Sequence, residues 1–137
     1  ICTGALLGDG RSVLTAAHCL LGSSRTATFV NAAGTSFSQT ASSALFFGHP
    51  DYDGNVLHGN DVAIIKYPLP FDASIPRYNL VSSGFDALGQ QGVVVGFGES
   101  GVGSSGATTS HGTKMPQKTQ RGMPRTLGTC VGMSPAG

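Results

Sequence analysis

Charged residues are scarce in this sequence. Asp, Glu, Lys and Arg together make up 11% of the 137 residues, whereas an average globular chain contains roughly 25%. The formal net charge is +1, so the chain lacks the strongly basic surface that binds nucleic acids or anionic membranes. We therefore expect no nucleic-acid partner and no membrane partner.

Long apolar runs and long helical patterns are also lacking. No run of 18 apolar residues occurs, and a membrane-spanning helix needs about that many. No apolar repeat of helical period extends over three turns. The chain instead contains 21 glycines among many serines and threonines, which is typical of short strands joined by turns of small residues. A chain of this length is long enough for one domain with a hydrophobic core, and we predict an all-β fold.

Short strands are predicted at residues 1–7, 12–14, 26–30, 37–47, 61–67 and 92–97, with one short helical turn at 17–21. Gly8-Asp9-Gly10 is a hairpin signal between the first two strands. The run from Asp61 to Tyr67 is nearly all apolar, which is typical of a strand buried on both faces. Pro68 ends this strand, because proline cannot donate to a sheet ladder.

The segment from Val13 to Cys19 is the strongest candidate for a functional site. Val13 and Leu14 are typical of the end of a buried strand, and the alanines that follow Thr15 permit a tight turn. This turn would place His18 at the edge of the core, where a histidine can accept and return protons near neutral pH as a general base. A packed histidine without a chemical role is the alternative.

Four segments, in order, resemble the trypsin-like (chymotrypsin-fold) serine proteases. Residues 14–19 resemble the active-site histidine segment of that family, and residues 49–52 resemble its His-Pro-x-Tyr segment. Residues 60–66 resemble the catalytic-aspartate strand. Residues 93–98 resemble the Gly-Trp-Gly strand that opens the second barrel, with Phe97 in the place of Trp. The resemblance covers residues 1 to about 106.

The resemblance implies a trypsin-like antiparallel Greek-key β-barrel, mostly the first barrel and incomplete. Residues 1–70 would form most of the first barrel, 71–91 the crossover between barrels, and 92–113 the start of the second barrel. Residues 114–137 are expected to form an irregular or disordered tail, because they contain four of the eight basic residues and no acidic one. A solvated basic tail and a sequence that has left its reading frame both remain open.

The resemblance assigns catalytic roles to His18 and Asp61. In the family a serine oxygen attacks the scissile carbonyl, a histidine takes the serine proton, and a buried aspartate holds that histidine in the correct tautomer. Asp61 lies 43 positions after His18, close to the separation in the family. Taken alone, Asp61 can also be an aspartate that caps a turn before a strand.

The nucleophile of the family is absent from these residues. Its Gly-Asp-Ser-Gly-Gly motif does not occur, and the serines in glycine-rich surroundings, Ser83, Ser100, Ser104 and Ser105, do not follow an aspartate. The sequence also has neither an initiator methionine nor a secretory signal at Ile1. We expect an internal fragment whose beginning is missing.

The leading hypothesis is therefore that this chain is part of a serine endopeptidase. That enzyme is expected to act on polypeptides, to be a monomer and to need no cofactor. The alternative is a binding module with a protease fold that has lost its serine. A structural β-protein unrelated to proteolysis would require four ordered matches to arise by chance.

Cys2, Cys19 and Cys130 are the only cysteines. An antiparallel hairpin around residues 8–10 would bring Cys2 and Cys19 toward each other, and the resemblance implies that these two form the disulfide that closes the histidine loop. Closing this loop would stabilise the fold by roughly 3 kcal/mol. A disulfide needs an oxidising compartment, so we expect a secreted or periplasmic protein. Cys130 has no expected partner.

No metal site is expected. Residues 51–55 partly match a calcium loop, but Val56 replaces the required glycine and Val62 the closing glutamate. No two of the four histidines have the spacing of metal ligands. His58 is interpreted either as a residue lining the substrate cleft or as an exposed loop histidine, His49 as a packed loop residue and His111 as a residue of the tail.

Overall fold

The computed structural model describes residues 2–86 and 88, and beyond them the backbone of residues 93–96, 100–102, 106–109, 115–118 and 130–135. In these parts the chain forms strands and three short 3-10 helices. The strands are β1 (Cys2–Leu6), β2 (Ser12–Thr15), β3 (Ser24–Val30), β4 (Ser36–Ser42), β5 (Phe46–Gly48), β6 (Ala63–Lys66), β7 (Val93–Gly96), β8 (Ser100–Val102), β9 (Gly106–Thr109), β10 (Met115–Lys118) and β11 (Cys130–Pro135). The 3-10 helices are η1 (Ala17–Cys19), η2 (Ser43–Leu45) and η3 (Val56–His58). The all-β prediction is confirmed.

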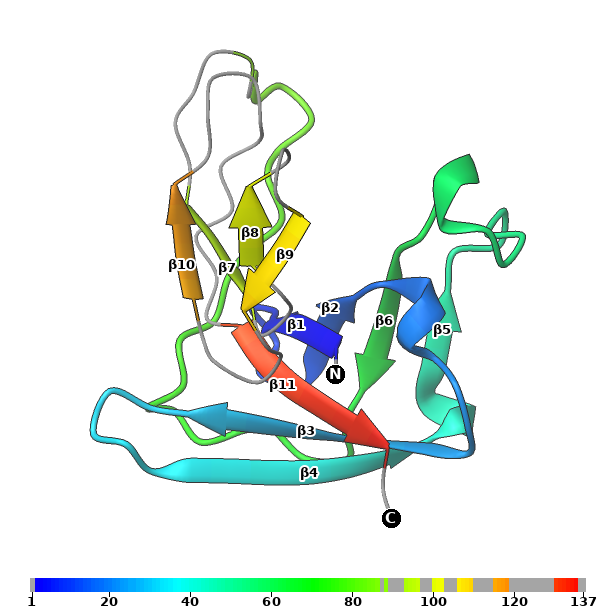
Figure 1. The fold of residues 1–137 in the computed structure, drawn as a ribbon. Coiled ribbons are helices and arrows are strands. Elements are labelled where there is room, and N and C mark those ends of the chain that lie inside the picture. The colour runs from blue at the N-terminus through cyan, green and yellow to red at the C-terminus, as the bar shows by residue number, and fades with distance from the viewer. Residues whose placement is uncertain are drawn as a thin grey trace.

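Seven strands form one antiparallel sheet in the order β4-β3-β11-β1-β2-β6-β5 (Figure 1). The long β3–β4 ribbon lies along one side of the molecule, and β6 and β5 stand next to β2 on the other. β4 and β5 are the two edge strands and do not pair with each other in the described part, so the barrel is not closed. The strand pairs β7–β10 and β8–β9 form two further small sheets.

The hairpin of β1 and β2 has the turn expected at residues 8–10. Ala5 pairs with Leu14, and Gly10 adopts a φ of 72°, which favours glycine. The Asp9 carboxylate accepts hydrogen bonds from the Arg11 and Ser12 backbone N–H groups and from the Ser12 hydroxyl. This closed turn places the end of β2 opposite β6, where Thr15 pairs with Ala63.

The core lies against the inner face of this sheet. Its fully buried large side chains are Tyr67, Phe29, Leu6, Ile65, Ile75 and Val13. Phe71 packs edge-on against Phe29 and Tyr67, with ring centroids 4.7 and 5.5 Å apart, a favoured aromatic geometry. Leu6, Val13 and Ile65 bring β1, β2 and β6 into contact with one cluster, which fixes the strands that flank the site described below.

The prediction of a strand buried on both faces at residues 61–67 is wrong. Ala63, Ile65 and Tyr67 are buried, whereas Ile64 is only half-buried and Lys66 is exposed. β6 neighbours the edge strand β5, and only its inner face contacts the core. The strand therefore alternates, as expected for a sheet with one solvated face.

Residues 114–137, which were expected to form an irregular or disordered tail, contain the strands β10 and β11 where the structure describes them. β10 pairs with β7, and β11 inserts between β1 and β3. His111 lies outside the described residues, and the proposed division into domains stays a prediction. No helix in the described part of the chain is long and apolar enough to cross a membrane.

Candidate active site

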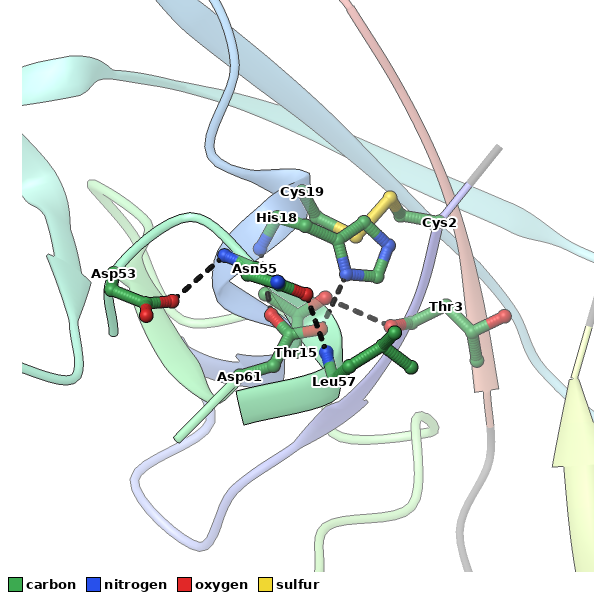
Figure 2. Close-up of polar contacts among 9 residues, drawn as sticks. All are labelled: Cys2, Thr3, Thr15, His18, Cys19, Asp53, Asn55, Leu57 and Asp61. Atoms are coloured by element: carbon green, nitrogen blue, oxygen red, sulfur yellow. Dashed lines mark hydrogen bonds and ion pairs between the residues drawn. A yellow bond between two sulfur atoms is a disulfide. The ribbon is translucent and has the colours of Figure 1, made fainter. Parts of the chain in front are cut away.

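His18 is held at the end of β2 by a tightly bonded turn. The Thr15 hydroxyl donates to the Thr3 carbonyl at 2.9 Å and ties the end of β2 to β1 (Figure 2). The 3-10 helix η1 follows at once, with Cys19 N bonded to Ala16 O at 3.1 Å. Cys19 is buried, whereas the His18 side chain is 52% exposed. The hydrogen-bonded turn is therefore anchored to the sheet, and the His18 imidazole extends from it toward solvent.

The Cys2–Cys19 disulfide is present, with a Cα–Cα distance of 6.1 Å. It joins β1 to η1 next to His18, so the histidine turn is covalently anchored. The two cysteine sulfurs and one ring nitrogen of His18 lie within 4.8 Å of one another. Metals bind cysteine as thiolate, and both sulfurs are consumed in the disulfide, so these residues do not fit a metal.

Asp61 reaches His18 from the loop that precedes β6. The two residues before it are Gly59, with a φ of 81°, and Asn60, with a φ of 58°, a conformation uncommon for a residue other than glycine. The Asp61 side chain is 18% exposed. This sharp bend turns the carboxylate toward η1.

The Asp61 carboxylate binds His18 through both of its oxygens (Figure 2). Oδ1 accepts the His18 backbone N–H at 2.8 Å, and Oδ2 lies 2.6 Å from ring atom Nδ1. A carboxylate at this position favours the tautomer with the proton on Nδ1. Within the described residues no group is bonded to Nε2, so its lone pair points to solvent and can accept a proton.

The environment of Asp61 favours its ionised form. Desolvation by itself raises the pKa of Asp61, but hydrogen bonds from the His18 side chain and from the His18 and Ala17 backbone outweigh it, and the net shift is downward. An ionised Asp61 stabilises a positive charge on His18. The pair can therefore take up a proton at Nε2 and return it, which is the chemistry of a general base.

A second histidine–aspartate pair, which the sequence reasoning missed, lies in the loop before Asp61. His58 Nδ1 is 2.6 Å from Asp53 Oδ2, as close as in the first pair. Here, however, the Asn55 side-chain nitrogen lies 3.2 Å from His58 Nε2 and occupies it. The available signal was an aspartate, an asparagine and a histidine within the six residues 53–58, a span that contains Gly54 and is followed by Gly59.

The other candidates from the sequence are not brought to this site. His49 Nδ1 accepts the Asp51 backbone N–H at 3.1 Å within its own loop. Both oxygens of Asp53 are bonded, to Asn55 N and to His58, so they are not directed at a common cation site. Ser83 is exposed between β6 and β7, Ser100 lies in β8, and Ser104 and Ser105 are outside the described residues.

Comparison with known proteins identifies the family of this chain. The sequence matches the family model described as trypsin over residues 1–127, a range that takes in His18, Asp61 and part of the segment after residue 114. A search of curated proteins found no match. Because the family match covers most of the chain, this protein belongs to the trypsin family.

Proposed function

We propose that this chain carries the general base, His18, and the orienting carboxylate, Asp61, of a serine endopeptidase. Membership of the trypsin family supports a serine-type peptidase in general. The observation that supports the specific roles is the double contact of Asp61 with His18, at 2.8 and 2.6 Å, which leaves Nε2 free. A serine hydroxyl bonded to Nε2 would complete a triad.

The proposed reaction transfers one proton back and forth. His18 Nε2 takes the proton of the serine hydroxyl while the serine oxygen bonds to the carbonyl carbon and the carbonyl electron pair moves onto its oxygen. His18 then gives the proton to the amide nitrogen as the C–N bond breaks. A water molecule repeats the sequence and releases the acyl group. Asp61 stays ionised throughout and stabilises the imidazolium.

The nucleophile is proposed to come from sequence outside these 137 residues, because the Gly-Asp-Ser-Gly-Gly motif does not occur within them. The substrates are polypeptides. The disulfide next to His18 supports a secreted or periplasmic location, because such bonds persist in oxidising compartments.

Labelling with a fluorophosphonate tests the proposal. Residues 1–137 alone should neither react with the probe nor cleave peptide esters, because His18 has no serine to activate. A longer protein that continues into the serine motif should do both. In that protein His18→Ala should lower the acylation rate by about 10⁴–10⁶-fold.

Asp72→Asn is the matched control, since the Asp72 carboxylate accepts hydrogen bonds from Ser74 within its own turn, including one from Ser74 N at 2.9 Å; it should leave the acylation rate unchanged. Labelling of the 137-residue chain at one of its own serines, Ser104 for example, would overturn the proposal.

A further inference from the structure

The loop that leads to Asp61 is closed by a network centred on His58. The Asp53 carboxylate accepts the Asn55 backbone N–H at 2.9 Å and contacts His58 Nδ1 at 2.6 Å. Asn55 is the N-cap of η3, and its side-chain oxygen accepts the Leu57 backbone N–H at 2.9 Å (Figure 2). The nitrogen of the same amide lies 3.2 Å from His58 Nε2.

The direction of the Asn55 amide limits which ring nitrogen of His58 can accept a hydrogen bond. Leu57 N is a donor, so the atom of Asn55 that faces it is the oxygen, and the atom that faces His58 is the NH₂ group. His58 Nε2 must then accept a hydrogen bond, and the ring proton lies on Nδ1 and points to Asp53. The network is complete only with a neutral His58.

We infer that His58 is a pH-sensitive positioning residue for Asp61. A protonated His58 has a donor at Nε2, which cannot bond to the Asn55 NH₂ group. The protonated ring can bond to Asn55 only if the amide turns over, and the oxygen is then withdrawn from Leu57 N. Protonation therefore sets the imidazole and the Leu57 N–H in competition for one oxygen, and η3 loses its cap.

Loss of the η3 cap affects Asp61 because only two residues connect η3 to it. η3 ends at His58, and only Gly59 and Asn60, both with positive φ, separate it from Asp61. Val62 N bonds to Asn60 O at 2.8 Å and fixes the far side of this bend. A loosened η3 removes the support on the near side, so the carboxylate that orients His18 becomes less well held.

The charged surroundings of His58 favour this response. Asp53 is the only carboxylate bonded to His58 in the described part of the chain, and the His58 hydrogen bond is the largest cause that lowers its pKa. The nearby Tyr52 has a raised pKa, through desolvation and then the charges of Asp61 and Asp53. Across the bend, the titratable group of η1 is His18, already paired with Asp61. The Asp53 carboxylate is thus already in place to form an ion pair with a protonated His58.

The inference deepens the proposed function, because Asp61 is the orienting carboxylate there, but its test does not depend on catalysis. Exchange of the Leu57 amide proton with water is followed by NMR in residues 1–137 from pH 8 to pH 5, relative to an unstructured peptide. As histidines become charged over this range, protection of this amide should fall about fivefold, the size expected for loss of one capping bond. The ¹⁵N spectrum at pH 8 should place the His58 proton on Nδ1.

Two variants isolate the switch. Asn55→Asp supplies two acceptor oxygens, which can bind Leu57 N and a protonated His58 together, so protection should persist to pH 5. His58→Gln cannot titrate and should make the protection independent of pH. His49→Gln is the control, because it removes a different histidine of the same loop and should leave the fivefold fall intact.

Constant protection in the unmodified chain, a proton on His58 Nε2 at pH 8, or a fall that survives His58→Gln would each overturn the inference. None of these outcomes would bear on whether a serine reacts with His18.

Discussion

The two histidine–aspartate pairs of this chain share one contact and differ in what the second ring nitrogen, Nε2, binds. His18–Asp61 and His58–Asp53 have the same Nδ1–Oδ2 distance of 2.6 Å, so the distance does not distinguish a base from a structural contact. His58 Nε2 is bonded to an amide, whereas His18 Nε2 is open. A proton acceptor needs an available Nε2, and this is why His18 rather than His58 is proposed as the general base.

Ionised Asp9 should stabilise the fold, so the stability should decrease at acidic pH. Desolvation raises its pKa, but the hydrogen bonds from Ser12 and Arg11 and the charge of Lys66 outweigh it, and the net pKa of Asp9 is below its usual 3.8. A group whose folded pKa is lowered stabilises the fold above its unfolded pKa, and this contribution is lost as the pH falls through the folded pKa. The urea midpoint should therefore drop as the pH falls below about 4, and less steeply in Asp9→Asn.

Asp51→Asn is the control for this titration, because its carboxylate has no hydrogen-bond partner in the described residues; it should keep the full slope. Part of the drop should remain in Asp9→Asn, since the pKa values of Asp53, Asp61 and Asp72 are also lowered. An unchanged slope in Asp9→Asn would show that the hairpin turn does not depend on this charge.

At the scale of elements, β6 has two different faces. Ile65 is fully buried in the core cluster, whereas its neighbour Ile64 is half-buried on the opposite face. Ile65→Ala should lower the free energy of unfolding by about 2–5 kcal/mol, through lost burial and the cavity left behind. Ile64→Ala should cost less than half as much, because part of its side chain stays in water in the folded state. Urea unfolding of both variants measures the difference.

Equal losses in the two variants would mean that both faces of β6 are covered, as the apolar run alone predicted.

The position of β6 also places the candidate site residues. Its pairing with β2, Thr15 to Ala63, brings the residues just beyond both strand ends together, and these are the histidine turn and Asp61.

At the scale of the whole molecule, the disulfide connects the sheet to the site. The Cys2–Cys19 bond closes a loop with a sequence separation of 17. Replacing both cysteines by serine should lower the stability by roughly 3 kcal/mol, chiefly because the unfolded chain gains freedom. Thermal unfolding measures this loss. Cys130→Ser leaves the bond intact and is the control, and a loss below about 1 kcal/mol in the double variant would contradict the estimate.

The sequence by itself was sufficient to predict the features that depend on neighbouring residues. The Gly8–Gly10 turn was readable because aspartate and glycine have strong conformational preferences. The strands β1, β2, β3, β6 and β7 were predicted from short β-rich runs bounded by turn residues. The single strand predicted over residues 37–47 is instead two strands, β4 and β5, with η2 between them. His18 and Asp61 were found by the order of the family's motifs. Their contact was predicted on that resemblance alone, and not from the physics of the intervening residues.

The tertiary structure decided what depends on distant partners. Burial of β6 depends on which neighbours cover each face, so an apolar run did not reveal that Ile64 is only partly buried. Insertion of β11 between β1 and β3 pairs residues more than a hundred positions apart, and its short sequence contains no signal for them. The His58 network depends on the direction of one amide, and that direction follows from the Leu57 N–H that it caps. Hydrogen-bond direction is a property of the folded loop, so residue order could not show which of the two histidines keeps a free Nε2.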